Sequence, residues 1–207
     1  MTEQEESAIK NISIPSLPKS EKESWRETKI ETSRLVVRAF RPEDAADLYE
    51  YLSQEEVYRF EPGEPVDREK AQKLAIEMTA SSGFWAVELK AEHKVIGQIY
   101  FEQVEPQRIM TWELGYILSP RHQRQGCATE AVSALLQRGF DAAGIHRVVA
   151  HCNPENTASW KLLERLGFRR EGHLKRNMFF RRDSNDNPLW NDTFIYAVLD
   201  GDYPHRL

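Results

Sequence analysis

The segment His122–Ala131 has the composition of a turn that binds an anion. It joins an apolar run to a stretch in which apolar residues recur every three or four positions, as expected for strand, turn and helix. A helix start leaves about four N–H groups free and carries a partial positive charge, so main-chain donors can hold a phosphate there. Gly126 and Ala128 leave room for that approach, and Arg121 and Arg124 add positive charge. The segment predicts a phosphate-binding turn.

Two common nucleotide-binding motifs do not fit this turn. No Gly-Lys-Ser or Gly-Lys-Thr follows the glycine, and the three glycines of a dinucleotide fingerprint are absent. The spacing does resemble motif A of the GNAT N-acetyltransferases, Gln/Arg-x-x-Gly-x-Gly/Ala, with Gln123, Gly126 and Ala128 at its fixed positions. In that family the motif binds the pyrophosphate of acetyl-CoA. The resemblance implies cofactor contacts from Tyr116, Ile117, Leu118, Gln123, Arg124, Gln125, Gly126, Cys127, Ala128, Thr129 and Asn156.

Three further segments resemble the RimJ/RimL-like branch of the same family. Residues 32–44 contain Thr-x-Arg-Leu-x-x-Arg followed by Pro-x-Asp. Residues 153–160, with Leu-Gly-Phe at 166–168, look like motif B in its RimJ/RimL form. Trp190 begins a Trp-x-Asp similar to that of the hairpin bordering the acceptor pocket in this branch, although core packing is an equal alternative for its side chain. The matches together extend from Thr32 to about Leu199.

The chemistry that this resemblance implies is attack of a neutral amine on a thioester, which leaves a thiolate that must be protonated. Many members place a tyrosine for that purpose four residues before the closing Gly-Phe, but this chain has Leu163 there. Asn156 and Ser159 would lie near a helix N-terminus, within reach of the sulfur, and the branch is thought to use this serine or a bound water. We predict Ser159 as the thiolate donor with Asn156 beside it, and helix capping alone is the alternative.

Glu113 is the candidate for the base that removes a proton from the amine. It is the one carboxylate on the strand that leads into the phosphate-binding turn, and partial burial would raise its pKa toward the working pH. A solvent-facing strand residue is the alternative. For the oxyanion we expect a main-chain N–H within Tyr116–Leu118, turned out of the ladder by a bulge at Gly115. The histidines at positions 122, 146, 151 and 173 show no pairing with Ser or Cys and receive no role.

Alternation and helical spacing predict the elements that position these residues. A helix begins near Pro42 and ends near Leu52, and a second follows the N-cap Asp67 and should form a wall on the substrate side. Asn156 caps a short helix that Gly167 ends. We expect strands over residues 30–40, 84–89, 95–104, 109–118, 146–150, 174–181 and 193–199.

The strand over residues 146–150 follows a crossover helix, so it should lie parallel to the strand that ends at Leu118. Short connections elsewhere favour antiparallel pairing. We expect an α/β fold: a GNAT-like single domain over residues 29–207 with a central mixed, mostly antiparallel twisted sheet flanked by helices. The resemblance implies a splay between the two central parallel strands. Residues 1–28, with six glutamates and few apolar side chains, should form a flexible or docked extension.

The composition argues against several partners. The net charge of -5 disfavours nucleic acid and suits a cationic or amine substrate. Cys127 and Cys152 cannot form a disulfide framework, and no metal-ligand spacing is present. Nowhere do 18 apolar residues run together. We expect a cytoplasmic monomer or homodimer without a metal, a membrane partner or a nucleic-acid partner.

The sequence thus predicts an acetyl-CoA-dependent N-acetyltransferase that works by direct attack in a ternary complex. A protein N-terminal α-amine is the first-choice acceptor, as in ribosomal-protein-alanine acetyltransferases. A small-molecule amine or antibiotic N-acetyltransferase is one alternative, because fold does not fix substrate. A non-catalytic acyl-CoA-binding module is the other, favoured only by Leu163 at the tyrosine position.

Overall fold

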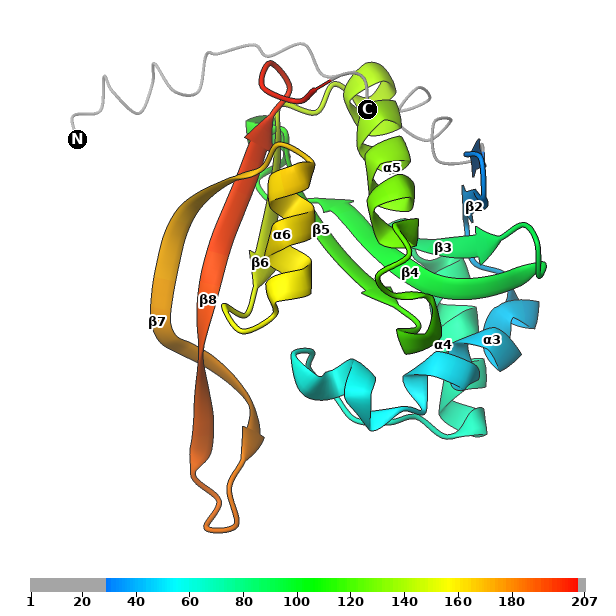
Figure 1. Ribbon diagram of the computed structural model, residues 1–207, viewed down its shortest axis with the longest axis vertical. Helices are drawn as coiled ribbons and strands as arrows, with labels where there is room; N and C mark the ends of the chain where they lie inside the picture. Colours follow the sequence, from blue (N-terminus) through cyan, green and yellow to red (C-terminus); the bar gives the residue numbers. More distant parts are fainter. Residues whose placement is uncertain (1–28, 205–207) are drawn as a thin grey trace.

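Eight strands form the sheet of the computed structural model, which describes residues 29–204 (Figure 1). Their order is β1-β2-β3-β4-β5-β6-β8-β7, and only the β5–β6 pair is parallel. The predicted mixed, mostly antiparallel sheet is confirmed. The expected extension over residues 1–28 lies outside the described residues. The strands are β1 (Ile30–Glu31), β2 (Leu35–Arg38), β3 (Phe84–Leu89), β4 (Lys94–Gln103), β5 (Thr111–Leu118), β6 (Arg147–Cys152), β7 (Arg169–Arg182) and β8 (Pro188–Leu199).

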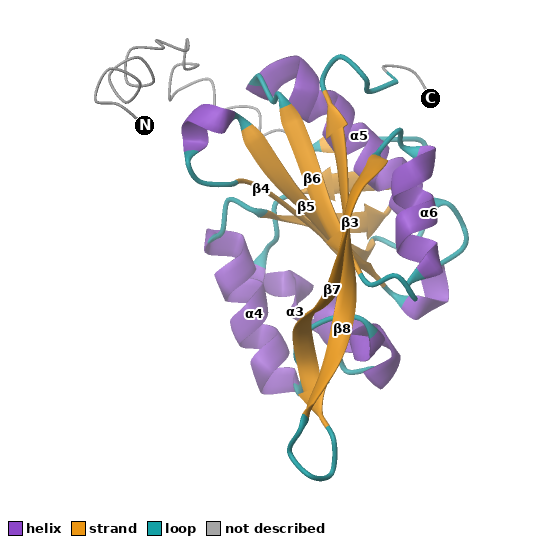
Figure 2. Cartoon of the chain, turned by 90° about the vertical axis from the view of Figure 1, so that its left-hand side faces the viewer, coloured by secondary structure: helices purple, strands orange, loops and turns teal. Residues whose placement is uncertain are grey.

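Helices cover both faces of the sheet (Figure 2). On one face the leucines of α5 and α6 belong to one core cluster with Trp85 and Phe101. On the other face α3 and α4 pack with Ala86 and Val95. The α-helices are α3 (Ala45–Leu52), α4 (Arg68–Ala80), α5 (Cys127–Ala143) and α6 (Thr157–Arg165), and the short 3-10 turns are η1 (Pro42–Asp44), η2 (Glu55–Arg59), η3 (Gln107–Ile109) and η4 (Pro120–His122).

Local signals placed most helix ends correctly. Asp67 caps α4 as predicted, because its carboxylate accepts a hydrogen bond from the Lys70 N–H at 2.8 Å. Gly167 follows α6 with a φ of +84°, a conformation that side chains rarely adopt. The single strand expected over residues 30–40 was wrong, because a bend at Thr32–Arg34 separates β1 from β2.

The two central strands separate before they end. The β5–β6 ladder pairs Thr111 with Arg147 and finishes at Leu114 opposite Ala150. Beyond that point β5 continues to Leu118 and β6 to Cys152 without further pairing between them. The splay that the family resemblance implied is confirmed. On its other side β5 pairs with β4 in unbroken register, so the expected bulge at Gly115 is absent.

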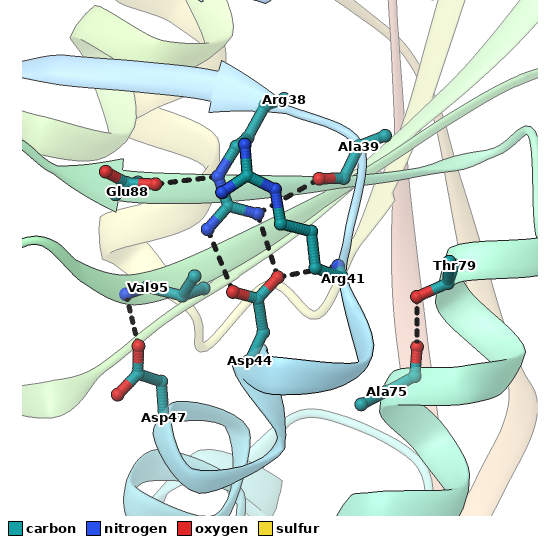
Figure 3. Close-up of polar contacts among 9 residues, drawn as sticks. All are labelled: Arg38, Ala39, Arg41, Asp44, Asp47, Ala75, Thr79, Glu88 and Val95. Carbon is teal, nitrogen blue, oxygen red and sulfur yellow. Dashed lines mark hydrogen bonds and ion pairs between the residues drawn. The ribbon is translucent and has the colours of Figure 1, made fainter.

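A buried arginine joins β2 to its neighbours (Figure 3). The two terminal nitrogens of Arg38 donate to the two carboxylate oxygens of Asp44, each at 2.8 Å, and its Nε donates to Glu88 at 2.6 Å. Asp44 also accepts from the Arg41 N–H at 2.8 Å, and so fixes the start of the first helix. Removing one partner of such a buried cluster would leave an uncompensated charge, so the three residues act as a unit.

A second cluster ties α5 to the bend between β1 and β2. Glu130, in the first turn of α5, accepts hydrogen bonds from Thr32 Oγ1 at 2.6 Å, Ser33 Oγ at 3.0 Å and the Arg34 N–H at 3.0 Å. The Arg34 guanidinium adds a bond from Nε at 2.7 Å. Burial opposes ionisation of this carboxyl, but the hydrogen bonds outweigh it and lower the pKa of Glu130 to about 2.

We therefore expect Glu130→Gln to destabilise the fold by about 2 kcal/mol at pH 7. The folded-state pKa lies below the ordinary value of 4.5, so this stabilisation is complete above about pH 4.5 and is lost as the pH falls toward 2. Urea unfolding at pH 7 and pH 3 measures the difference. Glu69→Gln is the control, because its pair with Lys73 is exposed and contributes little. If both substitutions lowered the free energy of unfolding equally at pH 7, the stabilising role of the Glu130 cluster would be contradicted.

Candidate functional site

A groove of about 870 Å³ lies between the end of β5 and the N-termini of α5 and α6. Ten of the eleven residues predicted to contact the cofactor line it, and Gln125 is the exception. The Gln125 side chain instead donates to the Arg121 carbonyl at 2.9 Å, and the main-chain carbonyl of Gln125 accepts from Arg34 Nη1 at 2.8 Å. The motif over residues 123–129 thus forms one wall of a continuous groove. Gln125 lies outside the groove and stabilises the turn through its contacts with Arg34 and Arg121.

The phosphate-binding turn enters α5 through left-handed backbone. Gly126 is the N-cap with a φ of +78°, and Arg124 has a φ of +59°. A Cβ at Gly126 would stand 3.4 Å from the Arg34 guanidinium. The main-chain N–H groups at the start of α5 therefore border an open cradle, as an anion requires. Gln123 ties the turn to the strand, because its side-chain amide donates to the Leu118 carbonyl at 3.0 Å.

Three polar residues meet where the groove reaches the splay. Asn156 caps α6 by accepting the Ser159 N–H at 3.2 Å, as predicted. The Tyr116 hydroxyl lies 3.0 Å from Ser159 Oγ and 3.1 Å from the Ser159 carbonyl, to which it donates. Burial raises the pKa of Tyr116 well above its usual range, so this phenol is a hydrogen-bond donor rather than an anion.

A smaller hollow of about 140 Å³ continues from this point between the end of β6 and the β7–β8 hairpin. His151, Asn153, Asn191 and Thr193 supply polar groups to its lining. Thr193 is 2% exposed, and its hydroxyl has no hydrogen-bond partner within residues 29–204. The groove and the hollow share Phe60, Glu61, Tyr116, Asn156 and Ser159, which therefore mark the junction between them.

Several expectations about this region were wrong. Glu113 lines neither space, and hydrogen bonding to His151 Nδ1 at 3.1 Å lowers its pKa instead of raising it. The helix α4 lines neither space, and Glu56, Val57, Arg59, Phe60 and Glu61 line that side instead. Of the two alternatives for Trp190, core packing is excluded, because the side chain is 52% exposed.

A family model described as an acetyltransferase (GNAT) domain matches residues 34–169. The chain belongs to the GNAT family of N-acetyltransferases. The uncharacterized N-acetyltransferase YnaD of Bacillus subtilis is 32% identical over 84% of this chain and 98% of its own length. The ribosomal protein uS5-alanine N-acetyltransferase of Escherichia coli is 27% identical over 84% of this chain and 92% of its own length.

Solved structures agree with this assignment. A GNAT-family acetyltransferase from Bacillus anthracis superposes with a TM-score of 0.75 at 30% identity, covering 84% of this chain and 99% of that one. RimJ of Mycobacterium smegmatis, solved with CoA-disulfide, has the same fold, with a TM-score of 0.72 at 23% identity over 87% of this chain and 91% of that one. The predicted RimJ/RimL-like resemblance is confirmed, and the GNAT family uses acetyl-CoA.

Other kinds of site find no support in the described residues of this acetyltransferase. Across residues 29–204, no cluster of three or more His, Cys, Asp or Glu side chains could hold a metal ion. Within the same part of the chain, the helices are too short or too polar to cross a membrane. Cys127 is 3% exposed and packs in the core beside the turn.

Sequence reasoning missed two titratable residues of the GNAT site. His151 lines the smaller hollow and is paired with Glu113. Glu61 lies at the junction, where burial raises its pKa to about 7. The Glu113–His151 pair could have been found from the parallel alignment of β5 and β6. Glu61 carries no comparable signal, because it follows a short 3-10 turn that no periodicity indicates.

We expect Gly126→Glu to reduce acetyl-CoA affinity at least tenfold while leaving the protein folded. The new carboxylate would occupy and repel the pyrophosphate position, and the left-handed backbone there would add strain of about 1 kcal/mol. Calorimetric titration with CoA measures the loss. Gly201→Glu adds the same charge beside open space in the turn after β8 and should bind normally. Unchanged affinity of Gly126→Glu would refute the phosphate-binding assignment.

Proposed function

We propose that this GNAT enzyme transfers an acetyl group from acetyl-CoA to a protein N-terminal α-amine by direct attack in a ternary complex. The observation that carries the proposal is that the groove and the smaller hollow meet at Tyr116, Asn156 and Ser159. The groove opens from the phosphate-binding turn, and the smaller hollow is bordered by the β7–β8 hairpin. Such an arrangement lets two substrates enter separately and meet, so no acetylated enzyme intermediate is required.

The residues of the groove fit acetyl-CoA. The cradle at Gly126 and the N–H groups at the start of α5 suit its pyrophosphate, with Arg124 nearby. The β6-facing edge of β5 loses its ladder partners after Leu114, so Tyr116–Leu118 can offer main-chain groups to pantetheine and to the oxyanion. This replaces the bulge that we expected. When bound, acetyl-CoA supplies the acetyl thioester.

Ser159 is the proposed proton donor to the leaving sulfur, with Asn156 holding the helix start beneath it. Tyr116 supports that role, because its hydroxyl shares a 3.0 Å contact with Ser159 Oγ and can orient it. Leu163 is buried and lines the smaller hollow, so the family's usual tyrosine position carries no hydroxyl. The phenol of Tyr116 reaches the junction from β5 instead, which weighs against a non-catalytic acyl-CoA-binding module.

The acceptor class follows from the smaller hollow and from the relatives. A volume of about 140 Å³ suits an amine on a small substituent, such as the first residue of a peptide. The Escherichia coli relative is named for alanine on a ribosomal protein, which supports a protein α-amine as first choice. Glu113 would influence such an acceptor only through His151, whose ring it holds at 3.1 Å. We therefore propose Glu113 as a positioning residue.

A panel of amines tests the acceptor. Thioester consumption would be measured with peptides that begin with alanine or serine, with the same peptides blocked at the N-terminus, and with small primary amines. Turnover of free but not blocked peptides, with acetylation located by mass spectrometry at the α-amine, is the expected result. Turnover of small amines alone would establish the small-molecule alternative. Binding of acetyl-CoA without any turnover would establish the non-catalytic module.

We expect Ser159→Ala to lower kcat about tenfold or more while changing the KM for acetyl-CoA less than threefold. Protonation of the sulfur matters mainly as the carbon–sulfur bond breaks, so its loss falls on turnover. Steady-state kinetics with the best peptide of the panel gives both constants. Ser133→Ala is the matched control, because this serine hydroxyl also contacts a tyrosine hydroxyl, at 3.2 Å, but lines neither the groove nor the smaller hollow. A Ser159→Ala variant with full turnover would leave this residue with a capping role only.

A further inference from the structure

Glu61 stands where the two substrates of the proposed reaction must meet. Among the described residues it is the only carboxylate that lines both the groove and the smaller hollow, since Glu56 and Glu155 line the groove alone and Asp192 the hollow alone. The acetyl group would arrive along the groove and the amine through the hollow. A carboxylate common to both is therefore placed at the reacting atoms.

The Glu61 carboxylate is also unengaged. Within residues 29–204 it makes no hydrogen bond or ion pair, and burial is the one influence on its ionisation. Asp192, by contrast, accepts from His173 at 2.8 Å, from Lys175 at 2.9 Å and from the Arg176 N–H at 2.9 Å. Its oxygens are occupied, and these donors lower its pKa below the usual range. Of Glu61 and Asp192, only Glu61 therefore has carboxylate oxygens available to accept a proton.

We propose that Glu61 is the catalytic base that takes a proton from the acceptor ammonium, an inference that rests on the proposed function. One N–H proton moves to the carboxylate, and the freed amine forms a bond to the acetyl carbon. The carbon–sulfur bond breaks with its electron pair on sulfur, which takes the hydroxyl proton of Ser159, and Ser159 regains a proton from water. The amide nitrogen releases its extra proton to water, and Glu61 returns its own to the solvent of the groove.

The surroundings of Glu61 suit this role. Tyr116 and Cys152 are close enough to interact with its charge, and both are neutral at pH 7 because burial raises the pKa of each. His151 and Asp192 line the hollow beyond them, and Arg59 and Arg165 line the groove. None of these groups forms an ion pair with Glu61 in the described structure. A pKa of about 7 places the proton affinity of Glu61 near the working pH, where a base is most effective.

The test compares Glu61→Gln with wild type from pH 6 to pH 9, using the best free-amine peptide of the panel. Wild-type kcat/KM should rise with pH through about 7, as Glu61 loses its proton. Glu61→Gln should lose about 100-fold at pH 7, and its rate should rise only with the pKa of the acceptor itself, about 8 for an α-amine. Glu61→Asp keeps a carboxylate with a shorter reach and should retain the rise near pH 7. Glu64→Gln, the same change three residues along on the exposed surface, should behave as wild type.

Thermal unfolding provides a readout that does not depend on activity. A carboxyl whose pKa is raised on folding destabilises the protein increasingly as the pH rises from 4.5 toward 7. Glu61→Gln should therefore unfold at a higher temperature than wild type at pH 8 and at the same temperature at pH 4. Circular dichroism and CoA titration establish that the variant is folded and binds.

The outcomes separate this inference from the function on which it rests. Wild-type protein that acetylates no amine would overturn both. Active wild type together with a Glu61→Gln variant that keeps the rise near pH 7 would overturn the base assignment alone, as would equal unfolding temperatures at pH 8. Loss of that rise in His151→Asn but not in Glu61→Gln would assign the base to the Glu113–His151 pair instead.

Discussion

Both hollows of the site depend on the early end of the ladder between the two central strands. β5 and β6 are parallel, and they stay paired for only four residues on each strand. Main-chain groups that lose a ladder partner must find another, because an unpaired buried N–H or C=O is costly. Gln123 meets part of this need, because its side-chain amide donates to the Leu118 carbonyl at the end of β5. Ligands in open α/β sheets bind at such carboxyl ends of parallel strands, and here the splay supplies the space.

The phosphate-binding turn must be both rigid and attractive to anions, and these demands conflict at Glu130. A carboxylate in the first turn stabilises α5 through the helix dipole, but its charge would repel a phosphate at the same helix end. Arg34 resolves the conflict by pairing with Glu130 at 2.6 Å while a second nitrogen holds the Gln125 carbonyl. The Thr-x-Arg pattern near residue 32 and the phosphate-binding motif near residue 126 are therefore two parts of one contact in this chain.

Much of the fold could be predicted from the sequence, because its signals are local. The cap at Asp67, the phosphate-binding turn and the alternation over residues 84–89 each depend on residues a few positions apart. The bend at Thr32–Arg34 could not be predicted this way, since the partner that stabilises it is Glu130 on a distant helix. The candidate site, too, could be predicted only where its residues lie close together in the sequence. Most residues predicted to contact the cofactor lie in one motif, whereas the environments of Glu61 and His151 arise only when separate elements pack together.

Glu61 and Glu130 show how one side chain serves opposite purposes according to its partners. Both are withdrawn from water, which by itself favours the neutral acid. Four donors from the β1–β2 bend overcome this tendency at Glu130, so its charge is fixed and stabilises the fold. Glu61 has no such donors in the described structure, so burial raises its pKa to about 7 and the carboxyl readily gains and loses a proton near neutral pH. A set of donors like that of Glu130 would stabilise Glu61 but would remove its affinity for a proton. Pairs of carboxyls whose surroundings separate their pKa values commonly distinguish chemical from structural roles, and on that ground the unpaired glutamate is the one suited to chemistry.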